Sequence, residues 1–282
     1  MNGIIIVDKE KQMTSHDVIN RLRKILKTKK VGHCGTLDPE ATGVLVCLVN
    51  QATKLSNFLV LDTKEYLATF KLGLATTTQD LAGQVIMEKP YQNDCSLVKL
   101  RKVLTLFQGK LSQTPSIYSA IKVNGKKLYE YARNNEAVTI PSREITIHKL
   151  ELIAFHNDLI TIKVNCSSGT YIRTLCYDIA QKLGYPGVLV ALRRTKSGNF
   201  SLADSYSLKQ IANGNYRLIK MAAALTDYDK RELSAEEYLA VRNGKELNAN
   251  CQKQFLAIYN NEVQAIYERP VAGVAKIKRG LW

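Results

Sequence analysis

The residue of this sequence best placed to perform chemistry is Asp38, in the glycine-rich segment Gly-His-Cys-Gly-Thr-Leu-Asp-Pro at positions 32–39. Ala-Thr-Gly follows at 41–43, and glycines at this density allow the backbone to come close to a ligand. A single carboxylate can serve as a nucleophile or as a base. An Asp-Pro pair is also a common start of a turn, so the local sequence is compatible with either role.

Two other residues stand out beside Asp38. Arg173 falls in the first turn of a helix expected over 170–183, where the helix dipole disfavours a cation. This local conflict predicts that Arg173 pairs with an acid elsewhere or with a phosphate, the alternative being an ordinary surface arginine. Tyr66 opens an alternating strand at 65–72; it is either a half-buried strand tyrosine or an aromatic platform for an extruded base.

Cofactor and metal motifs are missing from the sequence. It contains no G-x-x-x-x-G-K-[ST], G-x-G-x-x-G, H-E-x-x-H or C-x-x-C. His33 and Cys34 are adjacent, and neighbouring residues cannot easily face each other as base and nucleophile. We therefore expect no cofactor, no metal and a reaction that one carboxylate can carry.

The composition indicates an acidic partner. The formal net charge of the 282 residues is +15, which suits a protein that neutralises phosphates. The six cysteines form no zinc pattern and are expected to be free thiols. The apolar run at 4–7 is too short for a secretory signal, and no stretch is long enough to span a membrane. These features predict a cytoplasmic protein that binds nucleic acid.

The sequence contains segments with helical periodicity and segments with the alternation of strands, and these must position the residues named above. Thr14 or Ser15 is expected to cap a helix whose apolar residues recur at helical spacing up to Leu26. Its basic residues lead into the Asp38 loop and are candidates for phosphate contact: Arg21, Lys24 and Lys27. An apolar strand is expected at 44–49 and a hairpin over 145–166. This pattern predicts an α+β fold with a mixed, mainly antiparallel sheet flanked by helices.

Two segments differ in character from the rest. Residues 114–142 are rich in Pro, Lys, Arg and Tyr and are expected to protrude, with a short helix near 126–133. A boundary is expected near 227–229, which gives a larger domain at 1–226 and a small β-rich domain at 227–282. In the small domain we expect a helix over 234–241 and strands over 255–259, 262–267 and 271–277.

The ordered set of motifs resembles the TruB-type family of tRNA pseudouridine-55 synthases. The matching segments, in chain order, are 3–9, 14–18, 32–43, 52–54, the Leu-Gly turn with Thr76, Thr78, Asp80 and Gly83, 115–122, 125–133, 169–174 and 192–195. Cys34 stands where Thr is more usual and Gly187 where Ala is common. The order of the segments along the chain, more than any single motif, carries the resemblance.

The resemblance implies an isomerase that converts a uridine of the tRNA T-loop to pseudouridine after flipping the base, without a cofactor. It makes Asp38 the nucleophile, pairs Arg173 with it, and places Tyr66 on the flipped uracil. It also implies substrate contacts for His33, Lys54, Tyr171 and Leu192. It identifies 114–142 as a thumb insertion and 227–282 as a PUA-like RNA-binding domain.

By the same resemblance, the partner is the T-arm of tRNA, and the protein is a monomer that needs no protein partner. Two other interpretations are open. The chain could be an RNA-folding chaperone in which catalysis is secondary. It could also be a guide-RNA-dependent synthase, which the short N-terminus and the absence of a Lys-rich tail disfavour.

Overall fold

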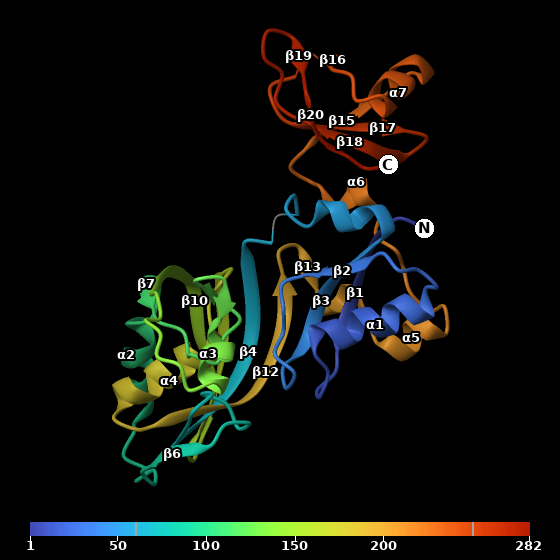
Figure 1. The fold of residues 1–282 in the computed structure, drawn as a ribbon. Coiled ribbons are helices and arrows are strands. Elements are labelled where there is room, and N and C mark those ends of the chain that lie inside the picture. The colour runs from blue at the N-terminus through green and yellow to red at the C-terminus, as the bar shows by residue number, and fades with distance from the viewer. Residues whose placement is uncertain (60, 250) are drawn as a thin grey trace. The chain divides into compact units, whose positions relative to one another are not determined.

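The structure is a computed structural model that describes residues 1–59, 61–249 and 251–282. The chain divides into two compact units. The first comprises Met1–Pro39, Gly43–Val60 and Asn199–Trp282, and the second comprises Glu40–Thr42 and Leu61–Gly198. Each unit combines helices with β-sheet (Figure 1), which agrees with the predicted α+β class.

The sheet of the first unit begins with β1 (Gly3–Lys9). This strand runs antiparallel to β3 (Thr42–Val49), which pairs in turn with the antiparallel β2 (Val31–Cys34). The short β14 (Ser205–Tyr206) runs parallel to β1. Because β1 and β3 carry almost unbroken apolar runs, both faces of these strands are buried.

Helix α1 (Ser15–Ile25) follows β1, and its cap is Thr14, one of the two residues predicted for that position. The Thr14 hydroxyl accepts a hydrogen bond from the Asp17 backbone N–H, and the Asp17 carboxylate accepts one from the Thr14 backbone N–H. The buried residues Val18 and Leu22 face the core of this unit. The short helices that complete this part are the 3₁₀ helices η1 (Asn50–Leu55) and η2 (Leu202–Asp204), with α5 (Leu208–Ala212) and α6 (Met221–Ala224).

The C-terminal part of the first unit is rich in β-structure, as expected. Its four-stranded sheet has the order β15 (Asp229–Glu232), β17 (Phe255–Tyr259), β18 (Glu262–Tyr267) and β20 (Ile277–Gly280). A separate two-stranded sheet is formed by β16 (Leu247–Asn248) and β19 (Val274–Ala275). Helix α7 (Ala235–Arg242) follows β15 in the chain. In the hydrophobic core of this C-terminal part, the Phe255 and Tyr267 rings are stacked with their centroids 5.1 Å apart.

The second unit is built on an antiparallel sheet. Its strands follow the order β12 (Gly187–Ser197), β4 (Thr63–Leu72), β11 (Leu159–Ser167), β10 (Arg143–His156) and β7 (Gly109–Gln113). Helices α2 (Leu97–Thr105) and α4 (Ile172–Leu183) contact each other, and α4 packs on β12 (Figure 1). A hairpin of β5 (Leu74–Thr76) and β6 (Val85–Glu88) precedes α2.

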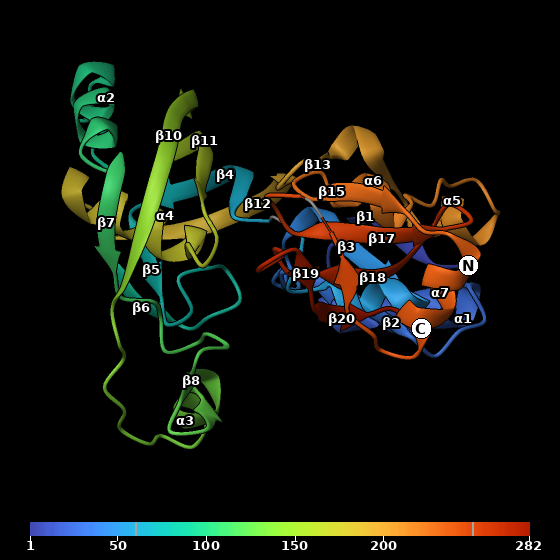
Figure 2. The ribbon, with the colours of Figure 1, turned by 90° about the horizontal axis from the view of Figure 1, so that it is seen from above.

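The predicted protruding segment lies between β7 and β10. It contains the two-residue strands β8 (Lys122–Val123) and β9 (Lys126–Lys127), followed by α3 (Leu128–Arg133). Figure 2 shows β8 and α3 beyond the ends of β7 and β10, joined to them by extended chain. We call residues 114–142 the thumb segment.

Two expected elements differ in their bounds in a way that the backbone conformation explains. The helix expected over 170–183 begins at Ile172, because the backbone of Tyr171 is still extended, with φ −92° and ψ 105°. The strand expected over 271–277 is interrupted, because Ala272 and Gly273 have φ angles of 52° and 79°. These left-handed conformations form a turn, so pairing resumes only in β19 and β20.

Candidate active site

The Asp38 loop connects the antiparallel strands β2 and β3. Asp38 itself is half-buried, and Leu37 beside it is 4% exposed. Gly35 begins the loop with a φ of 81°, a conformation that favours glycine. The loop therefore holds Asp38 half-buried just before a turn at 39–40, and this geometry is compatible with either role that the sequence left open.

A buried serine fixes the residue before Asp38. The Ser15 hydroxyl accepts a hydrogen bond from the Leu37 backbone N–H at 2.9 Å and donates one to the Leu37 carbonyl at 3.2 Å. Ser15 is the first residue of α1 and is 2% exposed. The start of the basic helix and the Asp38 loop are thus joined at one point.

A buried lysine fixes the residue after Asp38. Lys9 is 1% exposed, and its ammonium donates to the carbonyls of Pro39 at 3.0 Å, Met13 at 2.7 Å and Glu10 at 2.9 Å. Three carbonyls match the three donors of an ammonium group, which offsets the cost of burying the charge. Neither Lys9 nor Ser15 was predicted to act at the site, although a lysine ending an apolar strand is an unusual feature that could have indicated one.

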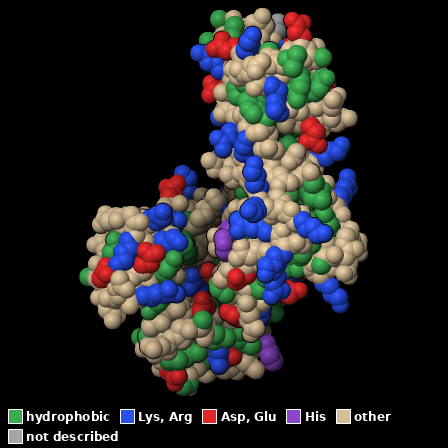
Figure 3. Space-filling view, turned by 45° about the vertical axis from the view of Figure 1, so that its right-hand side comes forward, with side chains coloured by type: hydrophobic (Ala, Val, Ile, Leu, Met, Phe, Trp, Pro, Cys, Tyr) green, Lys and Arg blue, Asp and Glu red, His purple; other side chains and the backbone are tan. Residues whose placement is uncertain are grey.

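The basic residues predicted to contact RNA lie on exposed parts of the first unit. Arg21 and Lys24 are exposed on α1, and Lys27 is exposed just after its C-terminus. Lys and Arg side chains are spread widely over the face drawn in Figure 3, in keeping with the net charge of +15. His33 is half-buried on β2.

Lys54 lies against the C-terminal strand of its own unit. Its ammonium donates to the backbone oxygens of Gly280 at 3.5 Å and Trp282 at 2.5 Å. Burial lowers the pKa of Lys54, and the nearby positive charges of Arg279 and Lys30 lower it further. This clustering of positive charge is a suitable environment for an anion.

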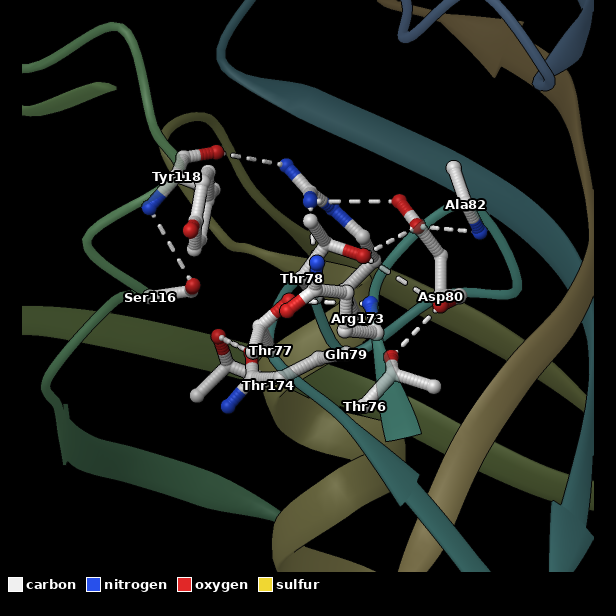
Figure 4. A network of polar contacts seen from close by, with 11 residues as sticks. Thr76, Thr77, Thr78, Gln79, Asp80, Ala82, Ser116, Tyr118, Arg173 and Thr174 are labelled. Atoms are coloured by element: carbon white, nitrogen blue, oxygen red, sulfur yellow. Dashed lines mark hydrogen bonds and ion pairs between the residues drawn. The ribbon is translucent and has the colours of Figure 1, made fainter. Parts of the chain in front are cut away.

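In the second unit, Arg173 has the acidic partner that its position predicted. Arg173 is 9% exposed on α4, and its Nη1 lies 3.2 Å from Asp80 Oδ2. The same nitrogen donates to the Thr78 carbonyl at 2.8 Å, and Nη2 donates to the Tyr118 carbonyl at 3.2 Å. Figure 4 shows the guanidinium between the turn that carries Asp80 and the thumb segment that carries Tyr118.

Asp80 is itself held firmly. Its Oδ1 accepts hydrogen bonds from the Thr78 hydroxyl at 2.5 Å and the Ala82 backbone N–H at 3.1 Å, while the Thr76 hydroxyl donates to its carbonyl at 2.6 Å. The carboxylate that pairs with Arg173 is therefore held by hydrogen bonds within its own turn (Figure 4). The sequence motif contains Asp80 but does not by itself indicate this role.

The other predicted residues of the second unit lie on the sheet and at the start of α4. Tyr66 is 7% exposed on β4, opposite Val164 of β11 and Arg194 of β12. Leu192 is half-buried on β12. Tyr171 is the N-cap of α4 and makes two backbone hydrogen bonds with the buried Gln113, a contact that was not predicted.

Asp38, His33, Lys54, Arg21, Lys24 and Lys27 belong to the first unit, whereas Tyr66, Tyr171, Arg173 and Leu192 belong to the second. Pairing of Asp38 with Arg173 stays a prediction. Within the described ranges, no three His, Cys, Asp or Glu residues are grouped as metal ligands. None of the described helices is long and apolar enough to cross a membrane.

Comparison with known proteins identifies the family. Residues 23–172 match the model described as TruB family pseudouridylate synthase (N terminal domain), and residues 173–230 match the tRNA pseudouridylate synthase B C-terminal domain. A protein of Limosilactobacillus reuteri (strain DSM 20016) named tRNA pseudouridine synthase B is 42% identical over 95% of this chain and 94% of that protein. A protein of the same name from Mesoplasma florum is 41% identical over 99% of this chain and 98% of its own length.

Solved structures show the same fold. A chain from the structure titled "Crystal Structure of a Cbf5-Nop10-Gar1 Complex" superposes with a TM-score of 0.73 at 22% identity, covering 99% of this chain and 85% of that chain. The fold and these matches define a pseudouridine synthase, an isomerase. Within that class, the chain belongs to the TruB family.

Proposed function

We propose that this enzyme converts uridine 55 in the T-loop of tRNA to pseudouridine, with Asp38 as the nucleophile. The observation that carries the proposal is the Asp38 loop, in which the residues on both sides of the carboxylate are held by buried side chains. Relatives about 40% identical over nearly the whole chain are named for a tRNA pseudouridine synthase activity. A fixed carboxylate is what a positioned nucleophile requires.

The reaction needs few groups. The glycosidic bond from N1 to C1′ breaks, the uracil turns, and C5 forms the new bond to C1′. C5 loses its proton to solvent and N1 gains one, so the product is an isomer of the substrate. Asp38 can attack C1′ or C6, or first remove a ribose proton, and every one of these routes needs an ionised carboxylate. Because nothing is oxidised or hydrolysed in the net reaction, the chemistry requires no cofactor.

Arg173 supplies the positive charge that would keep Asp38 ionised and oriented. A guanidinium carries five N–H donors, so contacts to Asp80, Thr78 and Tyr118 are compatible with a further contact to Asp38. Tyr66 would stack on the flipped uracil, near the C5 proton that must leave.

The remaining contacts would hold the RNA. Tyr171 and Leu192 would line the pocket, His33 would lie against the opened T-loop, and Lys54 would contact the nucleotide or its phosphate. The exposed cations Arg21, Lys24 and Lys27 would contact the phosphate backbone.

The thumb segment has the composition of an RNA-binding surface. Two cations lie near the Tyr129 ring, with Lys127 Nζ at 5.3 Å and the Arg133 guanidinium carbon at 5.4 Å from its centroid. Cations beside aromatic rings suit contact with phosphates and bases. Residues 1–226 would then form the catalytic domain, and 227–282 a PUA-like RNA-binding domain, in a monomer that acts on tRNA in the cytoplasm.

The test is release of tritium from tRNA transcripts that contain uridine tritiated at C5. The enzyme alone should release one tritium per tRNA, and sequencing should place the pseudouridine at position 55. Asp38→Asn should abolish release while tRNA binding persists. Undiminished release by this variant would reject the assigned nucleophile, and release at another uridine would reject the assigned site.

A further inference from the structure

Gln113, the last residue of β7, holds the backbone of Tyr171. Its Nε2 donates to the Tyr171 carbonyl at 3.0 Å, and its Oε1 accepts from the Tyr171 N–H at 2.8 Å. The Gln113 side chain therefore pairs with both backbone polar groups of one residue, as a neighbouring strand would. At 3% exposure, Gln113 makes these bonds away from solvent, where losing them is costly.

This contact lies at the point where α4 begins. Tyr171 is the N-cap of α4, yet its own side chain makes no capping hydrogen bond. Fixing Tyr171 therefore fixes the first turn, which carries Arg173 two residues later. The Tyr171 ring and the Arg173 guanidinium both depend on this one backbone position.

The residue opposite Gln113 holds the ring of Tyr171. Arg143, the first residue of β10, pairs with Gln113 in the register of β7 and β10. Its guanidinium carbon lies 5.6 Å from the centroid of the Tyr171 ring. The thumb segment leaves the sheet after Gln113 and returns at Arg143. The two residues that flank the thumb segment therefore both contact Tyr171.

The thumb segment also reaches the same helix turn directly, because Arg173 donates to the Tyr118 carbonyl. We infer that Gln113 is a positioning residue for the isomerisation, and that it links the base of the thumb segment to Tyr171 and Arg173. Gln113 acts through these residues and not by contact with the reacting atoms. The inference rests on the proposed function, in which Tyr171 and Arg173 serve the flipped uridine.

Two variants of Gln113 separate positioning from folding. Gln113→Met keeps the length of the side chain but removes both hydrogen bonds. It should lower the single-turnover rate at saturating enzyme by about tenfold to a hundredfold, while tRNA affinity stays within about twofold. Ser112→Ala, on the exposed neighbour in β7, is the matched control and should keep the wild-type rate.

Gln113→Glu provides a pH signature that a general loss of packing would not. An ionised Glu side chain accepts from the Tyr171 N–H but cannot donate to its carbonyl, whereas the protonated acid does both. The rate of Gln113→Glu relative to wild type should therefore recover as the pH falls from about 8 to about 5. The relative rate of Gln113→Met should stay constant over that range.

Arg143→Lys tests the second contact. A lysine keeps the positive charge but loses the planar group that covers the ring. The rate should fall while the salt dependence of tRNA binding is unchanged.

The inference is overturned if Gln113→Met keeps the wild-type rate, or if rate and affinity fall together with no pH-dependent recovery in Gln113→Glu. If the wild-type enzyme itself releases no tritium from tRNA, the proposed function fails instead. The two failures are therefore distinguished in the same assay.

Discussion

Arg173 and Asp80 form an ion pair with 3.2 Å between Nη1 and Oδ2, and their side chains are only 10% and 18% exposed. A pair with so little solvent is screened weakly, and removing one charge leaves the other in an unfavourable environment. The contact joins the turn after β5 to the first turn of α4. Asp80 is therefore well placed to orient the arginine that the proposed reaction needs.

Asp80→Asn should lower the rate of pseudouridine formation by about tenfold to a hundredfold, because Arg173 loses the charge that orients it. The rate is measured by single-turnover tritium release. Asp158→Asn is the matched control, since it removes one partner of the Lys71–Asp158 pair, whose side chains are 43% and 32% exposed. Equal rates for Asp80→Asn and wild type would show that the pair does not orient Arg173 for the reaction.

Lys9→Met should destabilise the first unit and the Asp38 loop together. The substitution leaves the Met13 and Pro39 carbonyls without the ammonium that they share. An unfolding free energy lower by about 2–4 kcal/mol follows from the cost of buried carbonyls that lose a charged donor. Urea denaturation measures it, with Lys11→Met as an exposed control. A loss no larger than that of the control would contradict the role assigned to Lys9.

The capping of α1 and the bounds of β17 and β18 followed from the sequence because they depend on residues close together in the chain. The hydrogen bonds of Lys9 and Ser15 to the Asp38 loop could not be predicted in this way, since they depend on strand β1 lying beside β3. Both Lys9 and Ser15 reach the loop only because these segments meet in the folded unit.

The partner of Arg173 shows the same limit. Its place at a helix start indicated an acid or a phosphate as the partner, and the sequence offers 25 Asp and Glu residues. The choice of Asp80 depends on the turn between β5 and β6 packing against α4. Gln113 could not be found from the sequence, because its contact with Tyr171 joins residues 58 positions apart.

Lys24 and Lys27 should contribute to tRNA affinity mainly through phosphates. Replacing both with Gln should weaken binding and reduce the slope of log affinity against log salt by about two, or about one for each lost contact. The modified position should not change. Lys149→Gln, which removes a single exposed charge, the partner of Glu151 on β10, is a control for the loss of surface charge elsewhere on the chain. An unchanged slope in the double variant would exclude these lysines from the RNA contact.

Gly187 is more constrained than its sequence suggested. By the family resemblance Ala is common at this position, but a Cβ built there would lie 2.2 Å from the Cβ of Ala180 on α4. Gly187→Ala should therefore lower the unfolding free energy by about 1–3 kcal/mol through overpacking.

Ala180→Gly should restore much of that loss in the double variant, because it removes the atom that clashes. A double-mutant cycle by chemical denaturation measures the coupling between the two positions. Additive losses would show that positions 180 and 187 are not coupled, which would contradict the close contact between β12 and α4.

Asp178 should make the stability of the second unit depend on pH. Asp178 lies on α4 and lines a pocket together with Leu175, Phe107, Ile145 and Lys182, and burial raises its pKa to about 6. In the unfolded chain an Asp titrates near about 3.9, so folding takes up a proton between these pH values. The protonated Asp178 carboxyl therefore favours the folded state. This contribution to the unfolding free energy is fully present below the unfolded pKa and is lost as the pH rises through the folded pKa of about 6.

Asp178→Asn removes the charge that is unfavourable at high pH. The variant should have a higher melting temperature than wild type at about pH 8 and nearly the same one at about pH 4, where the wild-type carboxyl is already mostly protonated in the folded state. Thermal unfolding followed by circular dichroism at both pH values measures the difference. A melting temperature raised equally at both would attribute the effect to packing, and one lowered at about pH 8 would mean that the ionised carboxylate has a stabilising partner.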